Sequence, residues 1–200
     1  MKLLVLDGNS IINRAFYGIK LLTTKDGRYT NAIYGFMNIF YKLCDELHPD
    51  SVAFAFDLKA PTFRHKMYDE YKAGRKPMPP ELAEQMPVLK DLLRALGYKI
   101  VTKEGYEADD ILGTIAKRCA AEGVEVSIVS GDRDLLQLAD THIKIRMPRT
   151  SKGTTEIRDY YPEDVKAEYQ VTPIEFIDVK ALMGDTSDNI PGVPSIGEKT

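Results

Sequence analysis

Three short, predominantly apolar runs stand out along the chain, at residues 3–6, 52–56 and 126–129. Each is rich in Val, Leu, Ile or Phe, and longer segments with helix-like spacing of apolar residues separate them. Short, mostly apolar runs without polar alternation are typical of strands in parallel sheets that helices cover on both faces. The pattern therefore predicts an α/β fold with a central, mostly parallel sheet flanked by helices.

Two helices are the clearest elements between these runs. Over residues 108–121 the apolar side chains recur at helical spacing, and Gly123 supplies a stop. A second helix is expected over residues 79–96, because two prolines and a glutamate open it and a leucine-rich stripe follows. Strands and helices thus alternate along the chain.

Composition narrows the class of protein. The 200 residues, 44% of them hydrophobic, suit a single main core. A net charge of -3 argues against a uniformly basic nucleic-acid binder. The opening apolar run is too short for a signal peptide and no stretch approaches membrane-spanning length, so we expect no membrane partner. Cys44 and Cys119 lie far apart, which makes a disulfide framework or a zinc site improbable.

Two segments depart from the strand and helix pattern. Residues 59–80 have little apolar periodicity and contain six basic residues against two acidic ones, which predicts a basic insertion separate from the core. The final stretch, residues 184–200, is dense in Gly, Pro, Asp and Ser and stops without an evident closing element. We therefore expect the chain to be a fragment.

Each of the three apolar runs leads into a carboxylate. Asp7 and Asp57 directly follow the first and second runs, and the third leads through two small residues to Asp132 and Asp134. The ligand crevice of an open parallel sheet lies beyond the carboxyl ends of its strands. Four acids from distant parts of the sequence are therefore expected to converge on one edge.

Three further acids at the start of the helix over residues 108–121 join this group: Glu107, Asp109 and Asp110. Glu107 lies on the inward stripe of that helix, where a carboxylate needs a partner. No Lys or Arg follows the strand ends, so we do not expect salt bridges to balance these charges. Two carboxylates about 4 Å apart repel by roughly 4 kcal/mol at an effective dielectric of 20, and divalent cations resolve this cost. All-oxygen ligands suit Mg²⁺ or Mn²⁺, and a pair of such ions can cleave a phosphodiester.

Each acid taken alone has an equally good structural explanation. Asp is a common turn residue after a strand, and acids at a helix start interact favourably with the helix dipole. A phosphatase of the haloacid dehalogenase type is disfavoured, because Asn9 stands where that class places its second acid. The joint pattern favours a two-metal phosphodiesterase.

Several motifs spread over essentially the whole chain carry a family resemblance. They are residues 6–10 (LDGNS), 14–16 (RAF), 55–57 (AFD), 71–75 (YKAGR), 105–110 (GYEADD), 130–134 (SGDRD) and 184–193 (GDTSDNIPGV). Together they resemble the 5′ nuclease (flap endonuclease) family, most closely the N-terminal 5′–3′ exonuclease domains of the bacterial DNA polymerase I type. The resemblance implies a PIN-like catalytic domain over residues 1–183 with a helical arch at about 59–80. It also implies the start of a helix–hairpin–helix element, truncated, over residues 184–200.

The resemblance also implies roles for individual residues. The first metal group would be Asp7, Asp57, Glu107, Asp109 and Asp110, and the second would be Asp132, Asp134, Asp185 and Asp188. In catalysis, Lys72 and Arg75 would reach the phosphate beside the metals, and Asp132 would be essential. The implied DNA contacts are Arg14, Arg64, Lys72, Arg75, Gly192, Gly197 and Lys199. At least two Mg²⁺ or Mn²⁺ ions are implied, with K⁺ a candidate at the hairpin turn.

The implied function is that of a structure-specific 5′–3′ exonuclease and flap endonuclease, which removes 5′ flaps and primers in DNA replication and repair by a two-metal mechanism. The expected partners are DNA with a 5′ flap, nick or 5′ end and, in the native chain, a C-terminal polymerase domain. We expect a monomer in the bacterial cytoplasm, associated with the nucleoid. Two alternatives stay open, namely a PIN-like ribonuclease and a catalytically idle module that binds DNA junctions.

Overall fold

A six-stranded sheet forms the centre of this computed structural model, in which the backbone is described for residues 1–151 and 154–197. The strand order is β3-β2-β1-β4-β5-β6, and all neighbours are parallel except β5 and β6. The strands are β1 (Lys2–Asp7), β2 (Ser51–Ala55), β3 (Lys99–Val101), β4 (Glu125–Val129), β5 (Ile143–Ser151) and β6 (Thr154–Tyr160). The predicted α/β class and mostly parallel sheet are confirmed.

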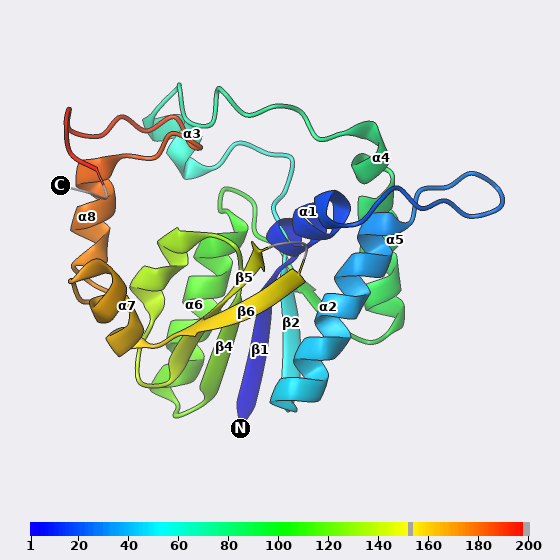
Figure 1. Cartoon of the computed structure of the whole chain (residues 1–200), viewed down its shortest axis with the longest axis horizontal. Coiled ribbons are helices and arrows are strands. Elements are labelled where there is room, and N and C mark those ends of the chain that lie inside the picture. The colour runs from blue at the N-terminus through cyan, green and yellow to red at the C-terminus, as the bar shows by residue number, and fades with distance from the viewer. Residues whose placement is uncertain (152–153, 198–200) are drawn as a thin grey trace.

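Helices cover both faces of the sheet (Figure 1). They are α1 (Gly8–Gly18), α2 (Asn31–Leu47), α3 (Phe63–Met67), α4 (Pro80–Ala83), α5 (Gln85–Ala95), α6 (Ala108–Ala121), the 3-10 helix η1 (Arg133–Leu138), α7 (Pro162–Tyr169) and α8 (Phe176–Met183). None of the described helices is both long enough and apolar enough to cross a bilayer.

The core explains why the first run is apolar at every position. Leu3 and Val5 of β1 pack with α6 and η1 on one face, whereas Leu4 and Leu6 pack with α1, α2 and α5 on the other. A strand that contributes to two cores has no solvent-facing side to carry polar residues. The central strands are thereby held rigidly, and their carboxyl ends lie at one edge of the molecule.

Two details differ from the sequence-based expectation. The sheet contains three strands that the apolar runs did not indicate, because β3 has three residues and the edge hairpin of β5 and β6 carries many charged and polar residues. The helix expected over residues 79–96 is divided at Glu84 into α4 and α5. Pro87 has no N–H to donate to the carbonyl of Ala83, so the helix cannot continue regularly through this turn.

The basic segment over residues 59–80 crosses the edge of the molecule where the strands end, between β2 and α4 (Figure 1). Only one five-residue helix, α3, lies wholly within it. It is tied to the C-terminal loop, because the amide of Lys72 donates to the carbonyl of Asp188 at 2.9 Å and the Asn189 side chain donates to the carbonyl of Glu70 at 2.8 Å. The segment therefore forms a cover over the strand ends.

Candidate metal and nucleic-acid site

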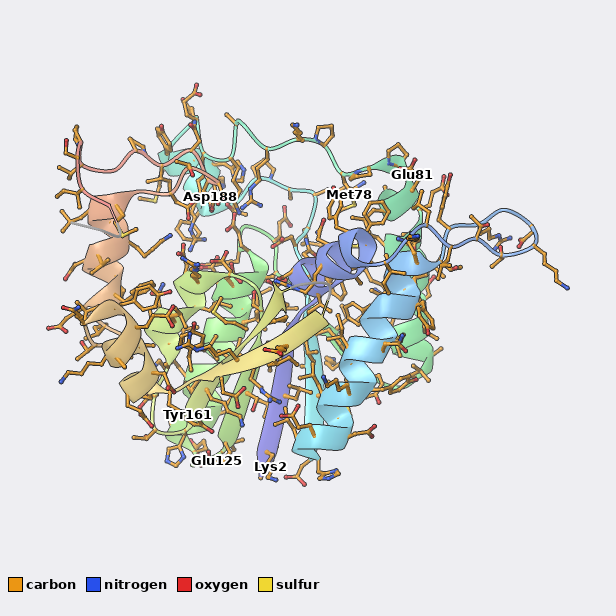
Figure 2. The ribbon with its side chains drawn as sticks, viewed as in Figure 1. Lys2, Met78, Glu81, Glu125, Tyr161 and Asp188 are labelled. Atoms are coloured by element: carbon orange, nitrogen blue, oxygen red, sulfur yellow. The ribbon has the colours of Figure 1, made fainter. Side chains whose placement is uncertain are left out.

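A cleft of about 1290 Å³ opens beneath this cover, at the carboxyl ends of the strands. Eight of the nine acids expected to hold metals line it: Asp7, Asp57, Glu107, Asp109, Asp110, Asp132, Asp134 and Asp188. Asp185 does not line the cleft itself. Figure 2 shows Asp188 at this end of the molecule, opposite Lys2 and Glu125 at the amino ends of β1 and β4. The structure therefore brings together acids that lie far apart in the sequence.

Two of these acids are positioned by the elements that follow the strands. Asp7 caps α1, since its carboxylate accepts from the amide of Ser10 at 2.9 Å, and it also accepts from the Ser130 hydroxyl at 2.7 Å. Asp57 accepts from the amide of Ala108 at 2.7 Å, at the first residue of α6. Backbone amides at helix starts thus orient both carboxylates while leaving room for further ligands.

We use the name inner carboxylates for Asp7, Asp57, Asp109 and Asp132. None of them forms an ion pair with a basic side chain in the part of the chain that the structure describes. Burial raises the pKa of Asp7 to about 6 and that of Asp109 to about 8, and neighbouring carboxylates add to both shifts. Burial also raises the pKa of Asp132. One buried oxygen of Asp109, Oδ1, has no hydrogen-bond partner among the described residues. No positive charge of the described chain therefore compensates the inner carboxylates when they are ionised.

The other five acids, the outer carboxylates, are Glu107, Asp110, Asp134, Asp185 and Asp188. Each of them pairs with a basic side chain. Arg64 donates two hydrogen bonds of 2.8 Å to Asp110, and the Lys72 ammonium lies 2.8 Å from Glu107. The remaining pairs are Arg75 with Asp188, and Lys180 with both Asp134 and Asp185. The outer carboxylates are therefore charge-compensated by the protein itself.

For the outer carboxylates, these ion pairs overturn the expectation that salt bridges would not balance the acids. The basic partners do not follow the strands, as the sequence argument required. They come from the 59–80 segment and from α8, which fold over the strand ends from distant parts of the chain. The pairs have electrostatic consequences. Burial opposes ionisation of Asp110 and Asp185, yet hydrogen bonds from Arg64 hold the pKa of Asp110 below its usual value, and those from Ser187 and Lys180 lower the pKa of Asp185 to about 2.

Two side chains in the site were not singled out from the sequence. The buried Tyr71 places its hydroxyl 3.0 Å from both Glu107 and Asp188, and it can donate its single proton to only one of them at a time. Lys180 was missed altogether. The only available sequence signal was its position on a helix five residues before Asp185.

The residues expected to contact DNA are distributed around the cleft. Arg14 lines it beside Gly131, together with Arg64, Lys72 and Arg75. Gly192 packs so closely against α8 that a Cβ atom there would lie 2.2 Å from the carbonyl oxygen of Met183, whereas a Cβ on Gly197 would have no described neighbour within 4 Å. Lys199 lies outside the described residues.

The donor set suits a hard divalent cation. As the described side chains stand, no group of three or more Asp, Glu, His or Cys residues is arranged around one ion position. The outer carboxylates are turned toward their basic partners. The inner carboxylates nevertheless offer only oxygen ligands, the pKa values of Asp7, Asp109 and Asp132 are raised, and Oδ1 of Asp109 has no hydrogen-bond partner among the described residues. Such oxygen ligands without His or Cys fit Mg²⁺ or Mn²⁺ rather than zinc.

A mostly parallel sheet with clustered acids at its carboxyl edge and a basic segment above them defines the PIN-like class of nuclease folds. Residues 2–170 match the model of the 5′–3′ exonuclease N-terminal resolvase-like domain, and residues 171–200 match that of the 5′–3′ exonuclease C-terminal SAM fold. The chain belongs to the 5′–3′ exonuclease family. The resemblance noted in the motifs is thereby confirmed.

Among curated relatives, the chain is 50% identical over 199 residues to DNA polymerase I of Bacillus caldotenax and 49% identical over 199 residues to that of Bacillus subtilis. Both alignments cover 100% of this chain, which spans 22% of the length of each polymerase.

Solved structures show the same fold. A variant of the bacteriophage T5 flap endonuclease, crystallised with DNA and metal ions, is 26% identical with a TM-score of 0.77, and the alignment covers 100% of this chain and 72% of that one. The catalytic core of Rad2 in complex with DNA is 18% identical with a TM-score of 0.60, over 98% of this chain and 58% of that one. The latter likeness concerns the fold alone.

Proposed function

We propose that this chain is a structure-specific 5′–3′ exonuclease and flap endonuclease that hydrolyses phosphodiesters of 5′ flaps and primers with two divalent ions, preferably Mg²⁺. The observation that carries the proposal is the set of inner carboxylates. Four acids from three strand ends and a helix start lie together without a basic partner in the described chain, beneath a basic covering segment. A purely structural cluster would be expected to compensate these charges internally.

The first metal group would comprise Asp7, Asp57 and Asp109, with Glu107 and Asp110 beside them. Asp132 would belong to the second group together with Asp134, Asp185 and Asp188, and its charge interacts with acids of both groups. Asp132 would therefore lie between the two groups, which makes it the acid whose loss affects both. Bound divalent ions would supply the positive charge that polarises the scissile phosphate and lowers the pKa of a water molecule.

The basic covering segment would provide the phosphate contacts. Lys72 and Arg75 lie over the acids, where each is held by a carboxylate of the protein. A guanidinium or ammonium that pairs with a carboxylate in the free protein can pair with a phosphate in the complex, because both partners are oxyanions. Lys72 and Arg75 would therefore leave Glu107 and Asp188 when DNA and metal bind. Arg64 would act in the same way at the side of α6.

The C-terminal loop would hold the duplex next to the flap. Gly192 allows this loop to pack tightly on the end of α8, and no described atom lies within 4 Å of a Cβ placed on Gly197. Backbone amides at such glycines can approach phosphates closely, and a K⁺ ion would bridge them. We propose that Arg14, Gly192, Gly197 and Lys199 contact the duplex, and that Arg14 does so from the α1 side of the cleft.

Cleavage of matched labelled substrates tests this function. A 5′-labelled flap DNA should be cut near the junction in Mg²⁺, and the chelator EDTA should abolish the cutting. The same flap in RNA should be a much poorer substrate. Preferred cleavage of the RNA flap would favour the PIN-like ribonuclease. Tight junction binding without chelator-sensitive cleavage by the wild-type protein would favour the idle binding module.

A further inference from the structure

Lys180 lies between two acids that belong to different parts of the chain. Its side chain extends from α8, and its Nζ atom is 3.0 Å from Oδ1 of Asp134 in η1 and 3.1 Å from Oδ2 of Asp185 after α8. Its side chain is 25% exposed, so the ammonium is partly shielded from water. The contact therefore links two outer carboxylates through one positive charge.

The two partners of Lys180 are half of the proposed second metal group. A divalent ion held jointly by Asp134 and Asp185 would need the place between their oxygens that the ammonium takes. The ammonium and the ion cannot both stay, because two cations in contact with the same carboxylates repel each other. The long flexible stem of lysine lets its compact charge leave such a place without any movement of the backbone.

The inner carboxylates differ from the Asp134–Asp185 pair in having no basic side chain of the described chain beside them. Asp7, Asp57, Asp109 and Asp132 have no basic partner within the described chain, whereas the Lys180 ammonium lies 3.0 Å from Asp134 and 3.1 Å from Asp185. The members of the proposed second metal group therefore differ. Asp132 has no cationic partner within the described chain, whereas Asp134 and Asp185 both contact the Lys180 ammonium. A divalent ion should therefore bind the inner carboxylates more readily than this pair.

We propose that Lys180 is a built-in counter-ion of the second metal group, which occupies the Asp134–Asp185 pair in the metal-free protein and competes with the divalent ion for it. This inference rests on the proposed two-metal function. It assigns Lys180 as a positioning residue that sets the affinity of the second ion and keeps the two carboxylates together until that ion arrives.

Metal binding to the free protein tests the competition. Titration of Mn²⁺, followed by electron paramagnetic resonance, should show a tight and a weaker class of ions in the wild-type protein. In Lys180→Met the weaker class should tighten by about tenfold, which corresponds to about 1.4 kcal/mol. Lys180→Arg should leave it weak, because the charge remains. In a Lys180→Met, Asp134→Asn double variant the gain should vanish.

Lys117→Met is the matched control. Lys117 lines the same cleft, but its ammonium pairs at 3.0 Å with Asp140, which is outside both metal groups. Its removal deletes the same charge nearby and should change the weaker affinity by less than about twofold. Equal tightening in both variants would show a general charge effect and would overturn the proposal.

A labelling experiment on the unaltered protein covers the case in which a variant fails to fold. Reductive methylation followed by mass spectrometry should modify Lys180 slowly without metal and several times faster in Mg²⁺, while Lys117 reacts equally in both. If the wild-type protein binds no divalent ion, the proposed function fails and this inference with it. If it binds ions, but Lys180→Met binds no tighter and the methylation of Lys180 ignores Mg²⁺, only the role of Lys180 is refuted.

Discussion

The inner carboxylates and four of the five outer ones line the same cleft, but the two sets differ in how their charge is balanced. Asp7, Asp57, Asp109 and Asp132 have no basic partner within the described chain, whereas every outer carboxylate has one. Three of the inner acids, Asp7, Asp57 and Asp132, have backbone or hydroxyl donors that orient them. The difference teaches that a single acidic cluster can contain two kinds of position: one that awaits an external cation and one that holds an exchangeable internal cation.

The comparison has a functional consequence. An uncompensated buried carboxylate destabilises the metal-free protein, which is tolerated where a metal or substrate later supplies the charge. A compensated carboxylate instead holds a basic side chain in an ion pair, close to the place where a phosphate would bind. Replacing an inner acid should therefore lower the rate of cleavage but raise the stability of the metal-free protein. Replacing a member of an outer pair should have smaller effects on both.

The largest expected effect is that of removing Asp132, whose charge interacts with acids of both proposed metal groups. Asp132→Ala should lower flap cleavage by about a thousandfold or more, since the charge stabilisation of the reacting phosphate is lost. Flap binding should remain measurable, because the basic covering segment is intact. Single-turnover cleavage and fluorescence anisotropy of the same labelled flap check this, and unchanged turnover in Mg²⁺ would refute the site assignment.

A smaller loss of cleavage activity is expected when Lys72, the partner of Glu107, is replaced. Lys72→Met should slow single-turnover cleavage by about a hundredfold, because one cationic contact to the phosphate is removed. It should not weaken Mn²⁺ binding, since Glu107 is then freed from its internal partner. Lys66→Met, an exposed basic residue of the same segment, serves as the control and should stay within a few-fold of wild type. A comparable loss in the control would mean that the segment acts only through its total charge.

Stability should respond to pH in opposite ways in the two regions. In the metal-free protein Asp109 keeps its proton up to about pH 8, whereas in the unfolded chain it releases it near pH 3.8. The folded state therefore binds more protons between these values, and Asp109 lowers the free energy of unfolding as pH rises. Asp185, with its pKa lowered to about 2, stabilises the fold above about pH 4 and loses this effect as pH falls toward 2.

Asp109→Asn isolates the inner contribution. At pH 8 in EDTA the variant should be more stable than wild type by at least about 2 kcal/mol, because each unit of pKa shift corresponds to about 1.4 kcal/mol. At pH 4 the two proteins should differ little. Urea unfolding at several pH values measures this. A variant that is less stable than wild type at pH 8 would show that Asp109 is a structural acid.

Gly192→Ala gives the smallest expected effect and separates duplex binding from the metal site. Its Cβ would lie 2.2 Å from the carbonyl oxygen of Met183, so the C-terminal loop must shift. Duplex affinity should fall several-fold, while the tight class of Mn²⁺ at the inner carboxylates keeps its wild-type affinity. A change in Mn²⁺ binding equal to the change in duplex affinity would mean that the loop and the inner carboxylates are coupled.

Much of the fold and the convergence of the acids could be predicted, because both depend on local patterns. The apolar runs predict buried strands, and a parallel sheet brings their carboxyl ends to one edge. The helix at 108–121 was predicted with its observed bounds. The edge hairpin of β5 and β6 could not be predicted in this way, because charged residues interrupt the apolar positions and leave no apolar run.

The division between inner and outer carboxylates could not be predicted either. It depends on which basic side chains fold over the cleft, and these lie far away in the sequence: Arg64 is 46 residues from Asp110. The segment that carries Arg64 has no regular period to indicate how it folds back. Lys180 carries no motif that would distinguish it from any other helix lysine. Only the three-dimensional structure pairs these charges.

The most direct test of the inner carboxylates is the proton balance of metal binding. Calorimetric titration of Mg²⁺ at pH 7, in two buffers with different heats of ionisation, measures how many protons leave the protein. Because Asp109 is largely protonated at this pH and a ligand must be ionised, Mg²⁺ binding should release up to about one proton, and Asp109→Asn should abolish the release. Mg²⁺ binding that releases no proton and is unaffected in Asp109→Asn would show that Asp109 is not a buried, protonated ligand of the ion.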